Sequence, residues 1–387
     1  MKMKVVAIKS IADVSSGNTP SRRKSEYWNG SIPWITTGEL ESGYVTASKE
    51  CVTEKALKET ALKLYHKGTV LIAMYGQGKT RGTAAVLGIE ATVNQACAAL
   101  TVHSGCSKFL FYQLQNSYHA IRRLSNTGNQ ENLNAEIIKN FKILWPDELE
   151  QQKIATILST QDKVIELKEK LLAQKQQQKK YLMQQLLTGR KRLPGFCEKW
   201  TRKQLGELFE NRVEINRSDL GLLAITSTRG ILPRDCLDLK DNSSEDKSKY
   251  LRICPGDIGY NTMRMWQGVS AYSEYEGIVS PAYTILAPME GVYSRYFAYL
   301  FKTQSVIFSF YRFSQGLVDD TRNLKYENFK KISVSIPSKV AEQRAIVQIL
   351  STADHEIELL QKSIEAEKQK KKALMQLLLT GKVRVRI

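Results

Sequence analysis

The sequence predicts an α+β protein built as a tandem repeat, in which two globular α/β segments alternate with two long helices. Two observations predict this class. Residues 150–192 and 342–384 align at a constant offset of 192 without a gap, and more than half of the aligned pairs are identical. The stretch before each copy alternates short apolar runs with Gly, Asn and Pro, which is typical of strands and turns.

The repeated stretches predict two long helices that pack on each other antiparallel. Apolar side chains recur every three to four residues, as in a coiled coil, and neither Pro nor Gly interrupts them. About 40 helical residues extend over roughly 60 Å. Asp147 is placed to cap the first helix, and Gly189 and Gly381 lie where glycine ends a helix. The predicted seam consists of Ile154, Leu158, Ile165, Leu172, Leu182, Leu186, Ile346, Leu350, Ile357, Leu360, Ile364, Leu374 and Leu378.

Each globular segment predicts strands followed by an amphipathic helix. In the first segment we expect strands at 69–74 and 96–102 and a helix at 109–124. A basic hinge containing Pro194 separates it from the second segment. There we expect strands and turns at 231–241, 250–262 and 281–286, and an aromatic-rich helix at 293–311. The predicted parts are a first globular domain at 1–145, a helix segment at 146–192, a second globular domain at 193–336 and a second helix segment at 337–387.

The composition favours a polyanionic partner. The formal net charge is +18, which points to nucleic acid before an anionic membrane. Six cysteines form no C-x-x-C pair and only four histidines occur, so a zinc site is not expected. Unpaired cysteines suit a reducing compartment, and neither a signal peptide nor a membrane span is recognisable. We therefore expect a soluble cytoplasmic protein without membrane association.

Two motifs suggest an enzyme but lack its full pattern. Gly76-Gln77-Gly78-Lys79-Thr80 resembles a phosphate-binding loop, yet Ala73 stands where the first glycine belongs. Asp147 and Glu166-Leu167-Lys168 have nuclease-like spacing, but a continuous helix would separate them by roughly 28 Å. No catalytic or metal-binding residues are therefore expected. A standalone ATPase or nuclease built on 69–82 or 146–168 stays an alternative, as does a basic scaffold.

Basic and amide-rich loops recur at matched positions in both halves. Arg bonds guanine bidentately, and Asn or Gln bonds adenine, so such loops are suited to reading base edges. Each loop taken alone is also compatible with a solvated surface. The candidate DNA-binding residues are Arg22, Arg23, Lys79, Thr80, Arg81, Asn129, Gln130, Asn132, Asn134, Arg229, Arg264, Trp266, Gln267, Arg322, Asn323 and Lys325.

With these features the sequence resembles the DNA-specificity subunits of type I restriction–modification systems. The strongest markers are Glu150-Gln151, Ile157-Leu158-Ser159-Thr160 and Leu186-Leu187-Thr188-Gly189, each repeated downstream. Gly17-Asn18-Thr19-Pro20-Ser21 is similar to the opening of a target-recognition domain, and Val279-Ser280-Pro281-Ala282-Tyr283 to a core strand of another. The second domain departs from the pattern, because only Leu205-Gly206-Glu207-Leu208 stands at its opening.

The resemblance implies a non-catalytic DNA-binding subunit. Two target-recognition domains, separated by conserved spacer helices, would read the two halves of a bipartite duplex target. The expected partners are double-stranded DNA, two adenine-N6 methyltransferase subunits, and restriction subunits joined through the methyltransferase core. No cofactor is expected in this chain, whereas S-adenosylmethionine, ATP and Mg²⁺ are expected on the partner subunits.

Overall fold

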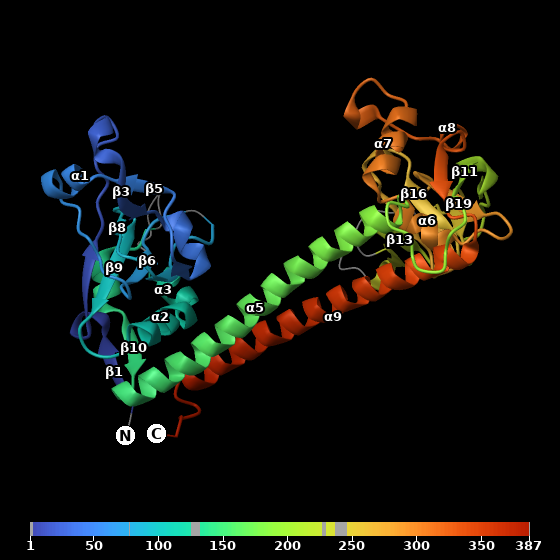
Figure 1. Cartoon of the computed structure of the whole chain (residues 1–387). Coiled ribbons are helices and arrows are strands. Elements are labelled where there is room, and N and C mark those ends of the chain that lie inside the picture. Colours follow the sequence, from blue (N-terminus) through green and yellow to red (C-terminus); the bar gives the residue numbers. More distant parts are fainter. Residues whose placement is uncertain (1–2, 77, 125–131, 227–229, 237–245, 387) are drawn as a thin grey trace. The chain divides into compact units, whose positions relative to one another are not determined.

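A computed structural model describes residues 3–76, 78–124, 132–226, 230–236 and 246–386 of the chain. It forms two compact units, which are Met1–Glu169 with Lys362–Ile387, and Lys170–Gln361. Helices α5 (Glu148–Leu186) and α9 (Val340–Leu378) each contribute residues to both units (Figure 1). Each unit therefore combines one globular segment with parts of both long helices.

The first unit is built around a five-stranded sheet of order β2-β9-β6-β7-β4, in which only the β4–β7 pair is parallel. A three-stranded sheet of order β5-β3-β8 and the antiparallel pair β1–β10 complete it. The strands are β1 (Lys4–Ala7), β2 (Ala12–Ser16), β3 (Trp28–Ile35), β4 (Tyr44–Val45), β5 (Glu50–Val52), β6 (Val70–Ala73), β7 (Ala84–Leu87), β8 (Thr92–Val93), β9 (Cys97–Val102) and β10 (Lys142–Trp145). The short helices are α1 (Glu54–Glu59), α2 (Ser107–Asn116), α3 (Tyr118–Arg123) and α4 (Ala135–Asn140).

The second unit repeats this plan around an antiparallel sheet of order β12-β19-β16-β17. Three two-stranded pairs, β11–β20, β13–β14 and β15–β18, surround it. The strands are β11 (Thr201–Gln204), β12 (Phe209–Asn211), β13 (Leu223–Thr226), β14 (Gly230–Pro233), β15 (Leu251–Ile253), β16 (Ile258–Asn261), β17 (Ser270–Tyr272), β18 (Gly277–Val279), β19 (Tyr283–Pro288) and β20 (Ser333–Ile336). The short helices are α6 (Ser294–Leu300), α7 (Gln304–Phe313) and α8 (Tyr326–Phe329).

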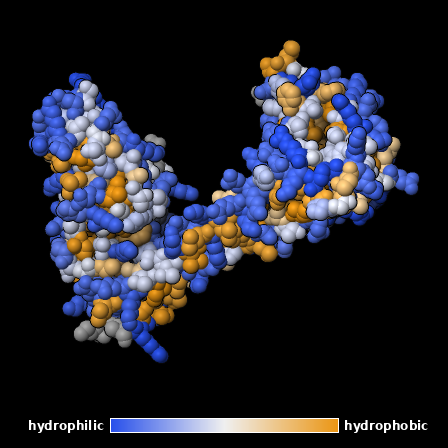
Figure 2. Space-filling view, in the orientation of Figure 1, coloured by the Kyte–Doolittle hydropathy of each residue, from blue (hydrophilic) through white to orange (hydrophobic). Residues whose placement is uncertain are grey.

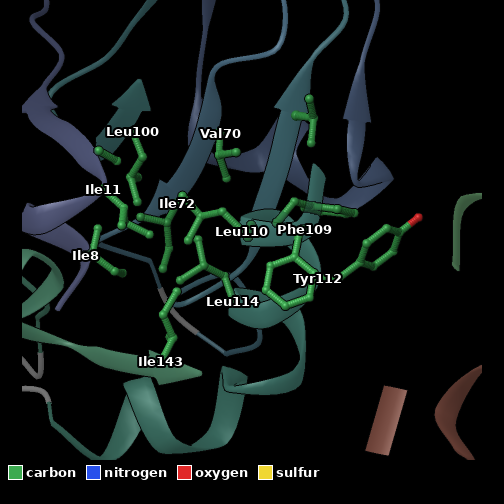
Figure 3. Packing of buried hydrophobic residues seen from close by; sticks show 14 of the residues in the cluster. Ile8, Ile11, Val70, Ile72, Leu100, Phe109, Leu110, Tyr112, Leu114 and Ile143 are labelled. Atoms are coloured by element: carbon green, nitrogen blue, oxygen red, sulfur yellow. The ribbon is translucent and has the colours of Figure 1, made fainter. Parts of the chain in front are cut away.

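The first unit buries a core between its main sheet and helix α2. Val70 and Ile72 project from one face of β6, because side chains alternate along a strand. They pack with Phe109, Leu110 and Leu114 (Figure 3). Removing a fully buried leucine side chain from such a core costs about 2–5 kcal/mol. The shared core therefore holds α2 against the sheet.

The ends of the long helices agree with the sequence prediction. The Asp147 carboxylate accepts a hydrogen bond from the Glu150 N–H at 3.0 Å and so caps α5. Gly189 and Gly381 follow the two helices with φ of 69° and 71°, the left-handed conformation that favours glycine. These residues therefore begin and end the helices as expected.

Hydrogen bonds join α5 and α9 within each unit. They link Gln161 to Glu367, Lys168 to Ser363, Lys175 to Glu356 and Lys179 to Asp354. Partner numbers fall along α9 as they rise along α5, so the helices run antiparallel inside each unit. Supercoiling of the pair stays a prediction.

The predicted seam residues are buried mainly where the helices meet the globular segments. Ile154 and Leu158 belong to the core of the first unit, and Ile346 and Leu350 to that of the second. Of the seam positions nearer the middle of the helices, Ile165 and Ile364 are buried, whereas Leu172, Ile357 and Leu360 are half-buried. The apolar stripe therefore holds each globular segment on the helices as well as joining the helices to each other.

Both predicted amphipathic helices are broken into two. The first divides into α2 and α3 at Ser117, whose ψ of 6° departs from helical geometry. The second divides into α6 and α7 because Thr303 is extended, with φ −78° and ψ 143°. Of the stretch 231–241, for which the sequence predicts strands and turns, the first residues belong to β14, which ends at Pro233, a short 3-10 turn follows at Arg234–Cys236, and 237–241 lie outside the described residues.

Candidate nucleic-acid interface

The hairpin loop between β6 and β7 holds three candidate residues in three different environments. Lys79 is exposed, Thr80 is half-buried and Arg81 is buried, with 7% of its surface accessible. The loop leads into an antiparallel strand, whereas a nucleotide-binding loop leads into a helix N-terminus. Arg81 therefore belongs to the interior of the loop and Lys79 to its surface. Gln77 lies outside the described residues.

A basic hollow of about 850 Å³ lies beside this loop in the first unit. Its walls include Lys79 from the loop, Gln115 from α2, and Tyr118, His119 and Arg122 from α3. The hollow is open to solvent, and its side chains include cations and amides that bond phosphates or base edges. The surface of each unit is hydrophilic over most of the visible face (Figure 2).

Arg22 is held by its neighbours. Its Nη2 donates to the Glu50 carboxylate at 2.9 Å, and its guanidinium lies 3.7 Å from the ring centroid of Trp28. Arg23 beside it is exposed. The ion pair engages two of the five N–H donors of the guanidinium and fixes its orientation.

The matched Asn-Leu dipeptides have the same place in both units. Leu133 is buried and its N–H donates to Met74 O at 3.0 Å, directly after β6. Leu324 is buried and its N–H donates to Thr262 O at 2.9 Å, directly after β16. Each dipeptide therefore fastens the segment that precedes a short helix to the start of a hairpin loop.

The asparagines themselves have structural contacts. Asn134 caps α4, because its Oδ1 accepts from the Ile137 N–H at 2.8 Å. Asn132 is half-buried, and the backbone of Asn323 pairs with Gln315. Asn129, Gln130 and Arg229 lie outside the described residues.

The second unit brings several candidates around Tyr311. Trp266 packs against the Tyr311 ring at a centroid distance of 6.2 Å, and the Arg322 guanidinium lies 4.0 Å from the same ring. Arg264 and Gln267 on the β16–β17 hairpin loop are exposed, as is Lys325 in front of α8. An edge-to-face contact with Tyr311 and the Arg322 cation, 6.0 Å from the Trp266 ring centroid, hold Trp266 in place beside the exposed donors.

Sequence reasoning did not single out Tyr311, although the aromatic-rich pattern of 293–311 included it. Tyr311 contacts Trp266 because α7 packs against the β16–β17 loop. A contact between segments that are distant in the sequence leaves no local sequence pattern.

Two equivalent polar clusters at the helices were also missed. In the first unit Tyr112 donates to Asp162 at 2.7 Å, and Lys371 pairs with the same carboxylate at 2.6 Å. The Tyr112 hydroxyl points out of the apolar core (Figure 3). In the second unit Tyr299 donates to Asp354 at 2.7 Å, and Lys179 pairs with Asp354. Burial and the neighbouring carboxylate raise the pKa of both tyrosines, so their hydroxyls remain donors.

Each unit also has a buried glutamate paired with an arginine. Glu342 accepts from Arg192 Nε at 2.7 Å and Nη2 at 2.8 Å. Glu150 accepts from Arg384 Nε at 2.6 Å. All four residues, and the Asp and Lys of the tyrosine clusters, are identical pairs at the offset of 192. Charged residues that are identical in both copies of the repeat would have indicated these clusters in the sequence.

The nuclease alternative has no geometric basis in this structure. Glu166 and Lys168 lie within the continuous helix α5, and Asp147 caps its start. Lys168 donates to Glu367 at 2.7 Å and is held by α9. Within the described parts of the chain, no three His, Cys, Asp or Glu residues are grouped to hold a metal, and no helix is long and apolar enough to cross a membrane.

Comparison with known proteins gives a consistent family. Residues 1–176 and 245–368 match the family described as type I restriction modification DNA specificity domain. The chain is 35% identical over 172 residues to the specificity subunit of the type I restriction enzyme MjaIX of Methanocaldococcus jannaschii, covering 43% of this chain and 39% of that one. It is 29% identical over 151 residues to the corresponding subunit of an Escherichia coli type I enzyme, covering 38% and 37%. The matches thus span about two fifths of these relatives.

The fold agrees with this assignment. The structure of a type I restriction–modification S subunit from M. genitalium superposes with a TM-score of 0.61 at 17% identity, covering 98% of this chain and 96% of that one. Members of the matched family are the non-catalytic specificity subunits of their restriction–modification systems. Since the family match covers most of the sequence, this chain belongs to the type I restriction modification DNA specificity family.

Proposed function

We propose that this chain reads a bipartite, asymmetric duplex DNA target, with one half-site recognised by each unit. This proposal is supported by the different hairpin loops that the two units present on the same plan of strands and helices. The loop after β6 contains Lys79 and Thr80, whereas the loop after β16 contains Arg264, Trp266 and Gln267. Equivalent loops with different donors would read different bases. The excess of positive charge would supply sequence-independent attraction to the phosphates.

The helices α5 and α9 would form an antiparallel coiled-coil spacer between the half-site readers. Their uninterrupted lengths and the antiparallel hydrogen bonds inside each unit support this role. A spacer of fixed length would set the number of unread base pairs between the half-sites.

The duplicated helices would also dock two adenine-N6 methyltransferase subunits. Leu167 and Leu359 occupy the same position in the two copies, and about half of each side chain is exposed, 53% and 51%. A matched pair of exposed leucines supports two equivalent protein contacts. Restriction subunits would join through the methyltransferase core, and S-adenosylmethionine, ATP and Mg²⁺ would bind to those partners.

The test is selection from randomised duplex DNA by the full chain assembled with its methyltransferase, followed by strand-resolved methylation of the enriched sequence. We expect two unlike half-sites at a fixed spacing, with one modified adenine on each strand. Enrichment of no sequence would instead favour a basic scaffold. ATP hydrolysis or DNA cleavage by the purified chain alone would favour the standalone enzyme.

A further inference from the structure

The β6–β7 loop is fastened to α3 through its backbone carbonyls. Arg122 donates from Nη2 to Gly78 O at 2.8 Å and from Nη1 to Arg81 O at 2.7 Å. The Tyr118 hydroxyl donates to Lys79 O at 2.6 Å. Three carbonyls of one short loop are therefore turned toward a single helix. Carbonyl oxygens repel phosphates, so this arrangement leaves the outer side of the loop to the cationic side chain of Lys79.

Glycine allows the loop to approach α3 closely. Gly82 has φ of 84°, and a Cβ there would lie 3.1 Å from Arg122 Cγ. Any other residue would meet both backbone strain and the Arg122 side chain. The loop conformation and the position of Arg122 therefore depend on each other.

The β16–β17 loop is fastened in the same manner by a different cation. Lys302, between α6 and α7, donates from Nζ to Gly268 O at 2.7 Å and to Ser270 O at 2.6 Å. Gly268 has φ of 79°, and a Cβ there would lie 2.8 Å from Ile307 Cδ1 on α7. This loop too is held against a helix pair by a cation that bonds two carbonyls.

The hydrogen bonds from Arg122 and from Lys302 hold loops that are equivalent in the topology of the two units. The sheet orders β2-β9-β6-β7 and β12-β19-β16-β17 correspond strand by strand, and a helix pair follows β9 and β19 alike. Arg122 lies in the second helix of its pair, and Lys302 lies in the turn between the two helices of the other pair. The two loops differ in sequence, yet each has a cation on its inner carbonyls.

We propose that Arg122 and Lys302 are positioning residues, which hold the two hairpin loops in the shape in which they read DNA. This rests on the proposed DNA-reading function. A loop held in its binding conformation loses less entropy when it binds, so its donors discriminate between bases more sharply. Neither cation needs to touch DNA for this effect.

The experiment is selection from randomised duplex DNA by the full-length chain assembled with its methyltransferase, and by its variants in the same assembly. Arg122→Gln should lower base preference about tenfold at the half-site of the first unit, with the other half-site unchanged. Lys302→Met should have the reverse effect. Arg122→Lys and Lys302→Arg, which keep a donor, should restore part of the preference. The exposed Arg123 and Lys331 provide matched controls as Arg123→Gln and Lys331→Met, which should leave both half-sites unchanged.

A purely structural role would lower thermal stability and weaken both half-sites together, and that result would overturn the proposal. If Arg122→Gln does not fold, Tyr118→Phe serves as the test at the same half-site, because it removes the hydroxyl that donates to Lys79 O and accepts from Arg122 Nη1 at 3.0 Å. Retention of wild-type preference by folded variants would refute the positioning role alone. If the wild-type chain enriches no sequence, the DNA-reading function itself fails and the proposal fails with it.

Discussion

Removal of Arg192 tests whether the paired glutamates hold each unit together. Glu342 is 2% exposed, and its carboxylate accepts two hydrogen bonds from the Arg192 guanidinium. In Arg192→Met the described structure leaves it only the indole N–H of Trp200, at 3.4 Å. Breaking a buried pair on one side costs about 3–5 kcal/mol. Since 28% of the Arg192 side chain is exposed, water can hydrogen-bond the Glu342 carboxylate once the guanidinium is removed. We therefore expect the free energy of unfolding to fall by an amount at the lower end of this range, about 3 kcal/mol.

The assay is urea unfolding of the full chain with a double-mutant cycle. Arg192→Met and Glu342→Gln are measured singly and together, and we expect a coupling of about 1–3 kcal/mol because the groups touch. Arg384→Met provides the matched comparison in the first unit. Its effect should be smaller, since 39% of the Arg384 side chain is exposed. Single costs below about 1 kcal/mol, or additive effects within about 0.5 kcal/mol, would refute the reasoning.

Four further predictions concern spacing, base reading, pH and thiol reactivity. Deleting residues 175–178, about one turn or roughly 6 Å of α5, should change the spacing between half-sites in the methylated motif while both half-sites persist; unchanged spacing would argue against a ruler. Arg264→Ala should relax one base position at a cost of about 1–3 kcal/mol in binding assays, whereas an equal loss on all sequences would mark a phosphate contact. Burial lowers the pKa of Lys302 from 10.5 to about 8, so between these values the unfolded state binds the proton more tightly and stability rises with pH. The free energy of unfolding of Lys302→Met should lack this contribution, which is at most about 1.4 kcal/mol per pH unit. An equal dependence of the unfolding free energy on pH in the wild type and in Lys302→Met would contradict the lowered pKa. Burial raises the pKa of the Cys97 thiol to about 12, so iodoacetamide at pH 8 should label exposed Cys197 and spare Cys97 until urea unfolds the chain, as peptide mass mapping would reveal.

The candidate site was only partly accessible from sequence. Loop composition pointed to Lys79 and Arg264, and both are exposed on equivalent hairpins. The same reasoning selected Arg81 and Asn134, of which one is buried and the other caps a helix. Burial depends on packing against α2 and α3, and cation or amide content alone does not reveal it. Arg122 went unnoticed because its carbonyl partners lie more than 40 residues away in the chain.

The sequence by itself determined the tandem plan, the two long helices and their ends. These features are local: a helix stripe repeats every three to four residues, and a glycine with positive φ ends the helix wherever it lies. The offset of 192 also marked Glu150, Asp162 and Arg192 with their copies, although not what they contact.

Only the tertiary structure decided which partners these residues meet. Asp162 bonds Tyr112 of a globular segment and Lys371 of the other long helix, and Asp354 makes the equivalent contacts. It also decided that the central strands β6 and β16 hold equivalent loops, since their neighbours β9 and β19 are distant in sequence. Such contacts join residues far apart along the chain, and folding brings them together only when the apolar faces of sheet and helix are buried against each other.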